Sequence, residues 1–99
     1  MKESQIQKQI VDYLKARGFF VIRNYMGPIH VYGKDFIRPN PNAGMPDLMA
    51  IKAGLTHFIE VKTKTGKLSD KQKQWIEKAY RAGLLVHVFR SLDDCMSVF

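Results

Sequence analysis

Apolar residues recur at helical spacing in the first part of the chain, from position 2 to position 17. They are Ile6, Ile10, Tyr13 and Leu14. Residues three or four positions apart lie on one face of an α-helix, so this spacing predicts an amphipathic helix. Gly18 follows directly, and glycine is common just after the end of a helix. We therefore predict a first helix over residues 2–17.

Short runs further along the chain are rich in β-branched, aromatic and other apolar residues. They cover residues 19–22, 47–51, 57–62 and 84–89. Runs this short are typical of buried strands rather than of helices, and we predict a strand at each. Residues 52–56 separate the second run from the third and include Gly54, which favours a tight turn. These two strands should form an antiparallel hairpin.

A second helix is predicted from Ser69 to Gly83. Its apolar face consists of Trp75, Ile76, Ala79 and Tyr80. A short last helix is expected from Ser91 to Phe99, with Ser91 as its N-cap and Asp94 three residues later, as in a capping box. The order of elements is then α-β-β-β-α-β, with a helical tail.

The segment from residue 24 to residue 46 is dense in glycine and proline. It contains Gly27, Pro28, Gly33, Pro39, Pro41, Gly44 and Pro46. Because these residues interrupt regular structure, the segment has room for no more than a short irregular hairpin through residues 30–32 and 36–37. Long loops in small domains commonly bind something, so the segment is either a contact surface or a connector.

The predicted hairpin brings charged residues together. If its turn centres on Ala53 and Gly54, Asp47 lies directly opposite Glu60. Directly opposed residues have Cβ atoms about 4.5–5.5 Å apart. Lys62 projects from the same face as Glu60, because side chains alternate with a period of two along a strand. An odd-length loop or a bulge would shift this register.

Two carboxylates this close repel each other unless a cation lies between them. Carboxylate oxygens suit Mg²⁺ or Mn²⁺, and a metal-bound water could attack a phosphodiester while Lys62 orients the water or stabilises the transition state. The alternative is a solvated salt-bridge cluster, worth about 0.5 kcal/mol per pair. The apolar residues around Asp47 and Glu60 favour the metal site, because burying a charged group in such strands costs free energy unless the group has a partner such as a cation.

Length and charge narrow the class of protein. The 99 residues have room for one domain, which we expect to cover residues 1–99, and its small core would gain stability from a second subunit. Sixteen Lys and Arg residues against nine Asp and Glu residues give a net charge of +7. Such a charge attracts polyanions, most commonly nucleic acid, although excess lysine can also serve solubility alone.

Cys95 is the single cysteine, so no internal disulfide can form, and we interpret it as a packing residue of a cytoplasmic protein. The sequence contains no secretory leader and no apolar run of about 18 residues, so no membrane association is expected. The histidines, His30, His57 and His87, lack zinc-site spacing with Cys95. His57 should face away from Glu60, and His30 is a candidate DNA contact. Without a glycine-rich phosphate loop, no nucleotide cofactor is expected.

The hairpin residues resemble the signature of the PD-(D/E)XK nucleases. Its two halves correspond to Pro46-Asp47 and to Glu60-Val61-Lys62. The longer stretch from Gly44-Met45-Pro46-Asp47-Leu48 through Ser69-Asp70-Lys71-Gln72 and Trp75 to Gly83 is similar to the VRR-NUC branch, the virus-type replication-repair nuclease domain, in stand-alone form. The resemblance is strong over about the C-terminal half of the chain and weaker over the first helix.

This resemblance implies an α/β fold with a restriction-endonuclease-like αβββαβ core, in which helices flank a mixed sheet. It implies a deoxyribonuclease dependent on Mg²⁺ or Mn²⁺. Asp47, Glu60 and the Val61 backbone carbonyl are the implied metal ligands, and Lys62 is the implied catalytic lysine. Glu3 is implied as an extra acidic group near the metal, although it equally suits the first turn of a helix, where the dipole favours acidic side chains.

Gln72 resembles a glutamine that such nucleases carry on the helix after the lysine strand, facing the active site. Ser69 and Gln72 also fit a capping box, so both roles are open. Trp75 shares a helical face with apolar neighbours, and we interpret it as a core residue rather than a base-stacking platform. Basic residues that could hold phosphates, or form a solvated charge run instead, are Arg23, Lys34, Arg38, Lys64, Lys67, Lys71 and Lys73.

The function expected from these residues is endonucleolytic hydrolysis of DNA. Members of the family resemble Holliday-junction resolvases, which implies a homodimer that acts on branched DNA. A stand-alone domain of this size would suit a phage or a bacterial cell. The alternatives are a non-catalytic nucleic-acid binding module that uses the basic face and residues 24–45, and a subunit of a repair or packaging complex. The intact Asp47, Glu60 and Lys62 argue against a degenerate nuclease.

Overall fold

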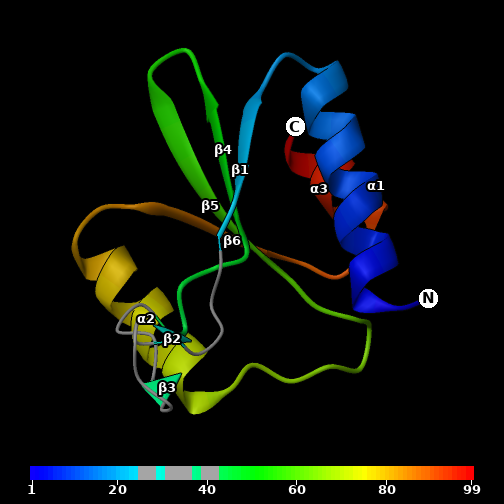
Figure 1. The fold of residues 1–99 in the computed structure, drawn as a ribbon. Coiled ribbons are helices and arrows are strands. Elements are labelled where there is room, and N and C mark those ends of the chain that lie inside the picture. Colours follow the sequence, from blue (N-terminus) through cyan, green and yellow to red (C-terminus); the bar gives the residue numbers. More distant parts are fainter. Residues whose placement is uncertain (25–28, 31–36, 39–42) are drawn as a thin grey trace.

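The computed structural model describes residues 1–24, 29–30, 37–38 and 43–99. In these residues a four-stranded sheet lies between helices that cover its two faces (Figure 1). Its strands, in chain order, are β1 (Phe20–Arg23), β4 (Leu48–Lys52), β5 (Leu55–Val61) and β6 (Leu85–Phe89). The helices are α1 (Glu3–Ala16), α2 (Asp70–Arg81) and α3 (Leu92–Val98).

The sheet has the strand order β1-β4-β5-β6 and contains both pairing directions. β4 is antiparallel to β1 and to β5, whereas β6 is parallel to β5. A parallel neighbour requires a crossover connection, and α2 lies in the connection between β5 and β6. The predicted mixed sheet with flanking helices is therefore confirmed.

The hairpin of β4 and β5 closes through a turn at Ala53 and Gly54, whose φ angles are 53° and 79°. Positive φ at both central positions gives the turn that best joins two twisted antiparallel strands. Lys52 accordingly pairs with Leu55, and the ladder continues to Leu48 opposite Ile59. The register predicted from this turn is confirmed for the paired residues of both strands.

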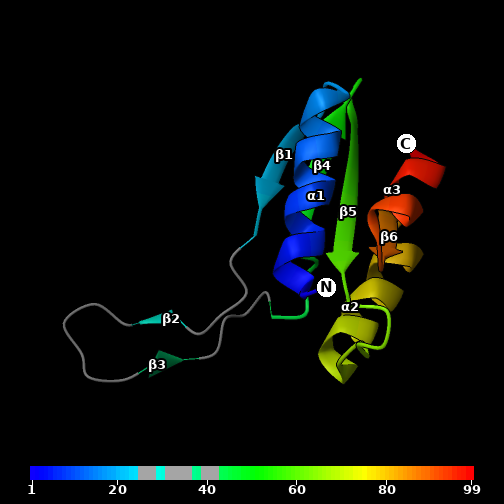
Figure 2. The same cartoon turned by 90° about the vertical axis from the view of Figure 1, so that its right-hand side faces the viewer.

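One face of the sheet is covered by α1 and α3 and holds the larger core (Figure 2). Its buried residues are Ile6, Ile10, Val11, Leu14, Leu48, Ala50, Ile59, Val61, Phe89 and Cys95. Each fully buried Leu or Ile contributes about 1.5–3 kcal/mol, so the predicted stripe on the first helix is what attaches it to the sheet. Burial raises the pKa of the Cys95 thiol to about 11, which leaves it a protonated packing residue, as predicted.

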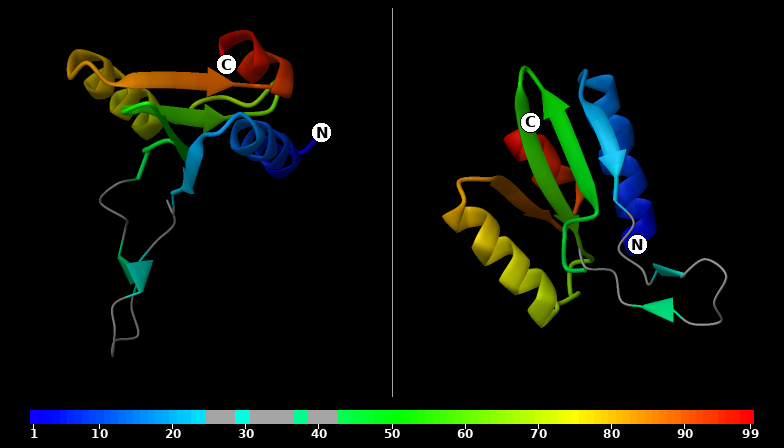
Figure 3. Two further views of the ribbon diagram at one scale, coloured as in Figure 1. Left: turned by 90° about the horizontal axis from the view of Figure 1, so that it is seen from above. Right: turned by 60° about the vertical axis from the view of Figure 1, so that its left-hand side comes forward.

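α2 covers the opposite face with a smaller apolar cluster (Figure 3). The ring of Trp75 packs against that of Phe58, with 5.2 Å between the ring centroids. Ala79 and Val86 are buried in the same cluster. Trp75 therefore packs in the core, as predicted.

The predicted helices and strands are present, with ends shifted by one or two residues. Ser91 Oγ accepts a hydrogen bond from the Asp94 N–H at 3.1 Å and caps α3 as expected. The carboxylate of Asp94, however, accepts from the Arg90 N–H at 2.8 Å, so the returning half of the expected capping box is wrong. The carboxylate reaches the residue before the N-cap instead.

Within the glycine- and proline-rich segment, β2 (Ile29–His30) and β3 (Ile37–Arg38) form a separate two-stranded antiparallel sheet. This pair agrees with the expected short hairpin, whose tip at residues 31–36 lies outside the described residues. Across the part of the chain that the structure describes, no helix combines the length and the apolar character that crossing a membrane requires.

Candidate functional site

Asp47 and Glu60 lie beside each other at the open end of the β4–β5 hairpin. The pairing of Leu48 with Ile59 reaches Asp47 and Glu60 when the same register is continued by one residue. Asp47 Oδ2 accepts a hydrogen bond from the Val61 N–H at 3.2 Å, which ties this carboxylate to β5. Glu60 is 1% exposed, and Asp47 is half-buried. The structure thus brings together the two carboxylates that the sequence singled out.

Lys62 stands two residues beyond Glu60, on the same face of the sheet. Its Nζ lies 3.8 Å from Glu60 Oε1, and its side chain is 13% exposed. Its backbone N–H donates to the Phe89 carbonyl at 3.0 Å, so contact with β6 continues past the end of β5. The ammonium group therefore lies beside the buried carboxylate rather than free in solvent.

Gln72 both caps α2 and contacts Glu60, and its role in catalysis stays a prediction. Its Oε1 accepts from the Ser69 N–H at 2.8 Å, and Ser69 Oγ accepts from the Gln72 N–H at 3.2 Å, which completes a capping box at the start of α2. Its Nε2 donates to Glu60 Oε1 at 2.9 Å. The cap decides which end of the amide faces Glu60, because a backbone N–H can only donate a hydrogen bond.

Two other segments, α2 and the residue after β1, contact the chain that leads to Asp47. Gly44 has a φ of +96°, and a Cβ there would lie 2.5 Å from the Lys71 carbonyl oxygen in α2, so no larger residue fits. Asn24, at the end of β1, donates from its N–H to the Asp47 carbonyl at 2.7 Å and from Nδ2 to the Pro46 carbonyl at 2.9 Å. Sequence reasoning missed Asn24, because a lone asparagine after a strand does not indicate so distant a partner.

The charge of Glu60 is poorly compensated within the protein. Burial and, next, the charge of Asp47 raise the pKa of Glu60 to about 8, and the ammonium of Lys62 offsets part of that rise. Glu60 Oε2 is buried and has no hydrogen-bond partner among the described residues. The alternative of a solvated salt-bridge cluster does not fit a carboxylate that is 1% exposed. A divalent cation would fit, because it would be a partner for Oε2 and would offset the repulsion between the carboxylates.

Glu3 lies in the first turn of α1, with an exposed side chain. Its charge contributes to the raised pKa of Glu60. Across residues 1–24, 29–30, 37–38 and 43–99, no group of three or more His, Cys, Asp and Glu side chains is arranged to hold a metal ion. The ligand roles of Glu3 and of the Val61 carbonyl therefore stay predictions.

The basic residues predicted to hold phosphates fall into three settings. Exposed lysines occur in the loop after Lys62 and in the first turns of α2, and Arg23 is exposed at the end of β1. The lysines are Lys64, Lys67, Lys71 and Lys73. Lys34 lies outside the described residues, and for His30 and Arg38 the structure describes the strand pairing alone.

His57 and His87 lie on the face of the sheet opposite Glu60. His57 Nδ1 and His87 Nε2 are 3.0 Å apart, and both rings pack edge-on against Phe99. Burial lowers the pKa of both imidazoles, and the charge of His57 further lowers the pKa of His87. The predicted orientation of His57 is confirmed, and this pair belongs to the core rather than to the candidate site.

Comparison with known proteins agrees with this fold. The family model of the VRR-NUC domain matches residues 1–93. No curated protein matches the chain. A solved structure titled "VRR_NUC domain" superimposes with a TM-score of 0.73 at 23% sequence identity, over 97% of this chain and 91% of that chain. This structural likeness shows the shared fold, and the family model spans all the residues of the candidate site. The chain therefore belongs to the VRR-NUC family of nuclease-type domains.

Proposed function

We propose that this chain is a metal-dependent DNA endonuclease, in which Asp47, Glu60 and the Val61 carbonyl hold Mg²⁺ or Mn²⁺. The observation that carries the proposal is the carboxylate of Glu60, which is 1% exposed, lies next to Asp47, and has one oxygen without a partner in the described part of the chain. Folding stability does not explain this arrangement, because an incompletely paired buried charge is destabilising. Cation binding does explain it.

When bound, the ion would supply a water of lowered pKa and positive charge at the scissile phosphodiester. The residues of the chain orient the reacting groups. Gln72 donates to Glu60 Oε1, so Oε2 is the oxygen that would bind a cation, and the Val61 N–H holds Asp47 Oδ2. Lys62 places an ammonium beside the Glu60 carboxylate, where it can donate a hydrogen bond to the attacking water or to a phosphate oxygen.

The substrate class in this proposal is branched DNA, such as a Holliday junction. A net charge of +7 favours a polyanion, and the exposed lysines after Lys62 and at the start of α2 lie along the chain on both sides of Gln72. The proposal includes a homodimer, because two copies related by a two-fold axis present two identical sites to two strands. Phage or bacterial cell interiors would supply such substrates.

A cleavage panel tests the proposal. The purified protein is incubated with a four-way junction, a flap, a nicked duplex and a plain duplex, each with Mg²⁺, Mn²⁺ or EDTA. We expect cleavage that requires the metal and is faster on branched DNA. Asp47→Ala should lower the rate by at least about 100-fold, since it removes a ligand of the reacting centre. The matched control is Asp12→Ala, which removes an exposed carboxylate paired with Lys8 on α1.

Equal rates for the wild type and Asp47→Ala would show that the assigned site is wrong. Binding of every DNA without metal-dependent cleavage would favour the alternative, a non-catalytic nucleic-acid binding module. Light scattering on the same samples measures the mass in solution. A cleaving monomer would contradict the homodimer while leaving the nuclease assignment intact.

A further inference from the structure

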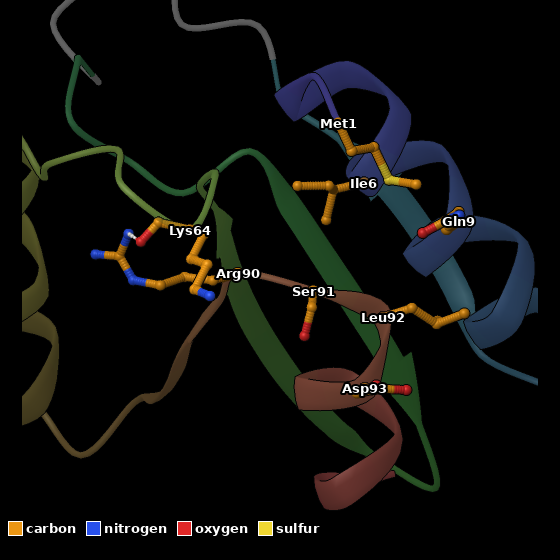
Figure 4. Close-up of a pocket in the computed structure, with 8 residues that line it drawn as sticks. All are labelled: Met1, Ile6, Gln9, Lys64, Arg90, Ser91, Leu92 and Asp93. Atoms are coloured by element: carbon orange, nitrogen blue, oxygen red, sulfur yellow. Dashed lines mark hydrogen bonds between the residues drawn. The ribbon is translucent and has the colours of Figure 1, made fainter.

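Arg90 follows β6 directly and connects three parts of the molecule. Its Nη1 donates to the carbonyl oxygens of Thr63 at 2.7 Å and Gly66 at 2.6 Å. The Lys64 carbonyl oxygen lies 3.5 Å from the same nitrogen, and Figure 4 shows Arg90 beside Lys64. Its backbone N–H donates to Asp94 Oδ2 at 2.8 Å, in the first turn of α3. One half-buried arginine thus links the end of β6 and the start of α3 to the loop that follows β5.

This loop connects Lys62 to α2, the helix that carries Gln72, and both of these residues contact Glu60. It leaves Lys62 at one end and reaches Ser69, the N-cap of α2, at the other. The loop turns back on itself, because the Gly66 N–H donates to Thr63 Oγ1 at 3.0 Å. The shape of this turn therefore sets the distance and angle between Lys62 and the start of α2, where Gln72 lies.

Within the turn, the Thr63 carbonyl accepts from the Gly66 N–H at 3.3 Å, and Arg90 adds a second donor to this carbonyl and a donor to the Gly66 carbonyl. The carbonyls of Thr63 and Gly66 both accept from a single guanidinium nitrogen, so their separation depends on this side chain. Arg90 also borders a cavity of about 370 Å³. A shorter side chain would remove the guanidinium from both carbonyls, which costs the Gly66 carbonyl this donor and leaves the Thr63 carbonyl with its weaker bond from the Gly66 N–H.

We propose that Arg90 is a positioning residue of the candidate site: by holding residues 63–66 it keeps Lys62 and Gln72 directed at Glu60. This inference rests on the proposed function. Arginine is also a common phosphate contact in nucleic-acid binding proteins. Here Nη1 is already bound to main-chain carbonyls at 2.6 and 2.7 Å, which favours the internal role. The phosphate-contact role becomes an outcome of the test.

Arg90→Lys and Arg90→Met test the inference, with Arg81→Met as the matched control. Arg81 is an exposed arginine of α2 whose side chain pairs with Glu77 at 2.6 Å. The first readout is amide hydrogen exchange at Gly66, which should become at least about 10-fold faster in Arg90→Met, as expected for the loss of a hydrogen-bonded anchor. Arg81→Met should leave this exchange unchanged.

The second readout is steady-state cleavage. We expect kcat of Arg90→Met to fall about 10- to 100-fold while KM stays within about twofold, because positioning acts on the reacting geometry rather than on DNA affinity. Arg90→Lys should fall in between, since an ammonium keeps the charge but not the planar fork. It also keeps the test open if Arg90→Met does not fold.

Two results would overturn the inference. One is a higher KM with unchanged kcat and unchanged Gly66 exchange, which would make Arg90 a DNA contact. The other is a lower melting temperature with kcat and KM as in the wild type, which would make its role merely structural. If the wild type cleaves no DNA, the proposed function fails, whereas Gly66 exchange still decides whether Arg90 holds the loop.

Discussion

Glu60 is a buried carboxylate with an incomplete set of partners among the described residues, an arrangement that is destabilising unless a cation binds to it. It lies near the end of the largely apolar strand β5 with 1% of its surface exposed, and its hydrogen bond from Gln72 and its ion pair with Lys62 both fall on the same oxygen, Oε1. The remaining oxygen carries the cost of burial without a partner in the described chain. The charged Glu60 carboxylate thus lowers the stability of the fold, whereas the proposed metal site requires that charge.

Glu60→Gln should separate these two effects of the charge. An acid with a pKa of 4.5 when unfolded and about 8 when folded binds its proton more tightly in the folded state, so the stability it contributes is present below pH 4.5 and is lost as the pH rises through 8. Without metal, Glu60→Gln should therefore melt at a higher temperature than the wild type at pH 8. With Mg²⁺ or Mn²⁺ present, it should lose the cleavage that the wild type shows. Thermal unfolding in EDTA measures this, with the exposed Glu77→Gln as control. A lower melting temperature for Glu60→Gln would contradict it.

Gln72→Ala should affect both folding and catalysis, because one amide serves both. Loss of half the capping box should cost about 1 kcal/mol of unfolding free energy. Loss of the donor to Glu60 should lower the cleavage rate by about 10- to 100-fold, as for other residues that orient a metal ligand. Chemical denaturation and initial rates measure the two effects.

Ser69→Ala is the control for this prediction. It removes the other half of the cap, the bond from Ser69 Oγ to the Gln72 N–H, and leaves the Gln72 side chain in place. It should be similarly destabilised while retaining most of the wild-type rate. Equal rates for Ser69→Ala and Gln72→Ala would show that the contact with Glu60 is not functional.

At the scale of the elements, the site depends on how closely α2 approaches the chain before β4. A Cβ at Gly44 would meet the carbonyl of Lys71 at 2.5 Å, whereas a Cβ at Gly54 in the hairpin turn would meet nothing within 4 Å. Both glycines have positive φ angles. A substitution by alanine therefore strains the backbone at both positions, but only at Gly44 does the added Cβ clash with a neighbour.

Gly44→Ala should be more destabilising than Gly54→Ala. Each loses about 1–2 kcal/mol to a left-handed alanine, and Gly44→Ala should lose about 1–3 kcal/mol more through overpacking. Because the clash pushes α2 away from Asp47, cleavage should fall in Gly44→Ala and not in Gly54→Ala. Denaturant unfolding and rates measure the difference. Equal losses of stability would mean that α2 does not lie against Gly44.

At the scale of the whole molecule, the parallel pairing of β5 and β6 joins the two ends of the chain through one aromatic cluster. His57 and His87 meet across these strands, and Phe99 packs on both rings while accepting a hydrogen bond at its carbonyl from the Tyr13 hydroxyl on α1 at 3.1 Å. Burial lowers the pKa of both histidines. The stability of this junction should depend on pH.

The sign of that dependence follows from the direction of the shifts. Imidazoles with a pKa below the unfolded value of 6.5 take up protons more readily when unfolded, so the stability they contribute is present above pH 6.5 and is lost as the pH falls below it. His87→Phe should reduce this loss. The melting temperatures of both proteins, compared from pH 8 to about pH 5, measure it, and the Glu60 contribution cancels because both retain Glu60. Parallel curves would contradict the prediction.

The local features of this protein could be predicted because their causes lie within a few residues along the chain. The stripe of Ile6, Ile10 and Leu14 determines the first helix. The turn at Ala53 and Gly54 determines the register that sets Asp47 against Glu60. The two halves of the motif were therefore placed correctly from the sequence, together with the face that Lys62 shares with Glu60.

Tertiary packing decided how deeply these residues are buried and which side chains surround them. Four features depend on segments that are far apart in the sequence. They are the burial of Glu60, the hydrogen bonds from Asn24 to the chain at Asp47, the contact of Gln72 with Glu60, and the hydrogen bonds from Arg90 to residues 63–66. No local pattern encodes such contacts, because they arise when β1, α2 and β6 pack against the β4–β5 hairpin. The sequence by itself thus determined which groups form the candidate site, because the motif and its register are local, and the tertiary structure decided how these groups are oriented and buried.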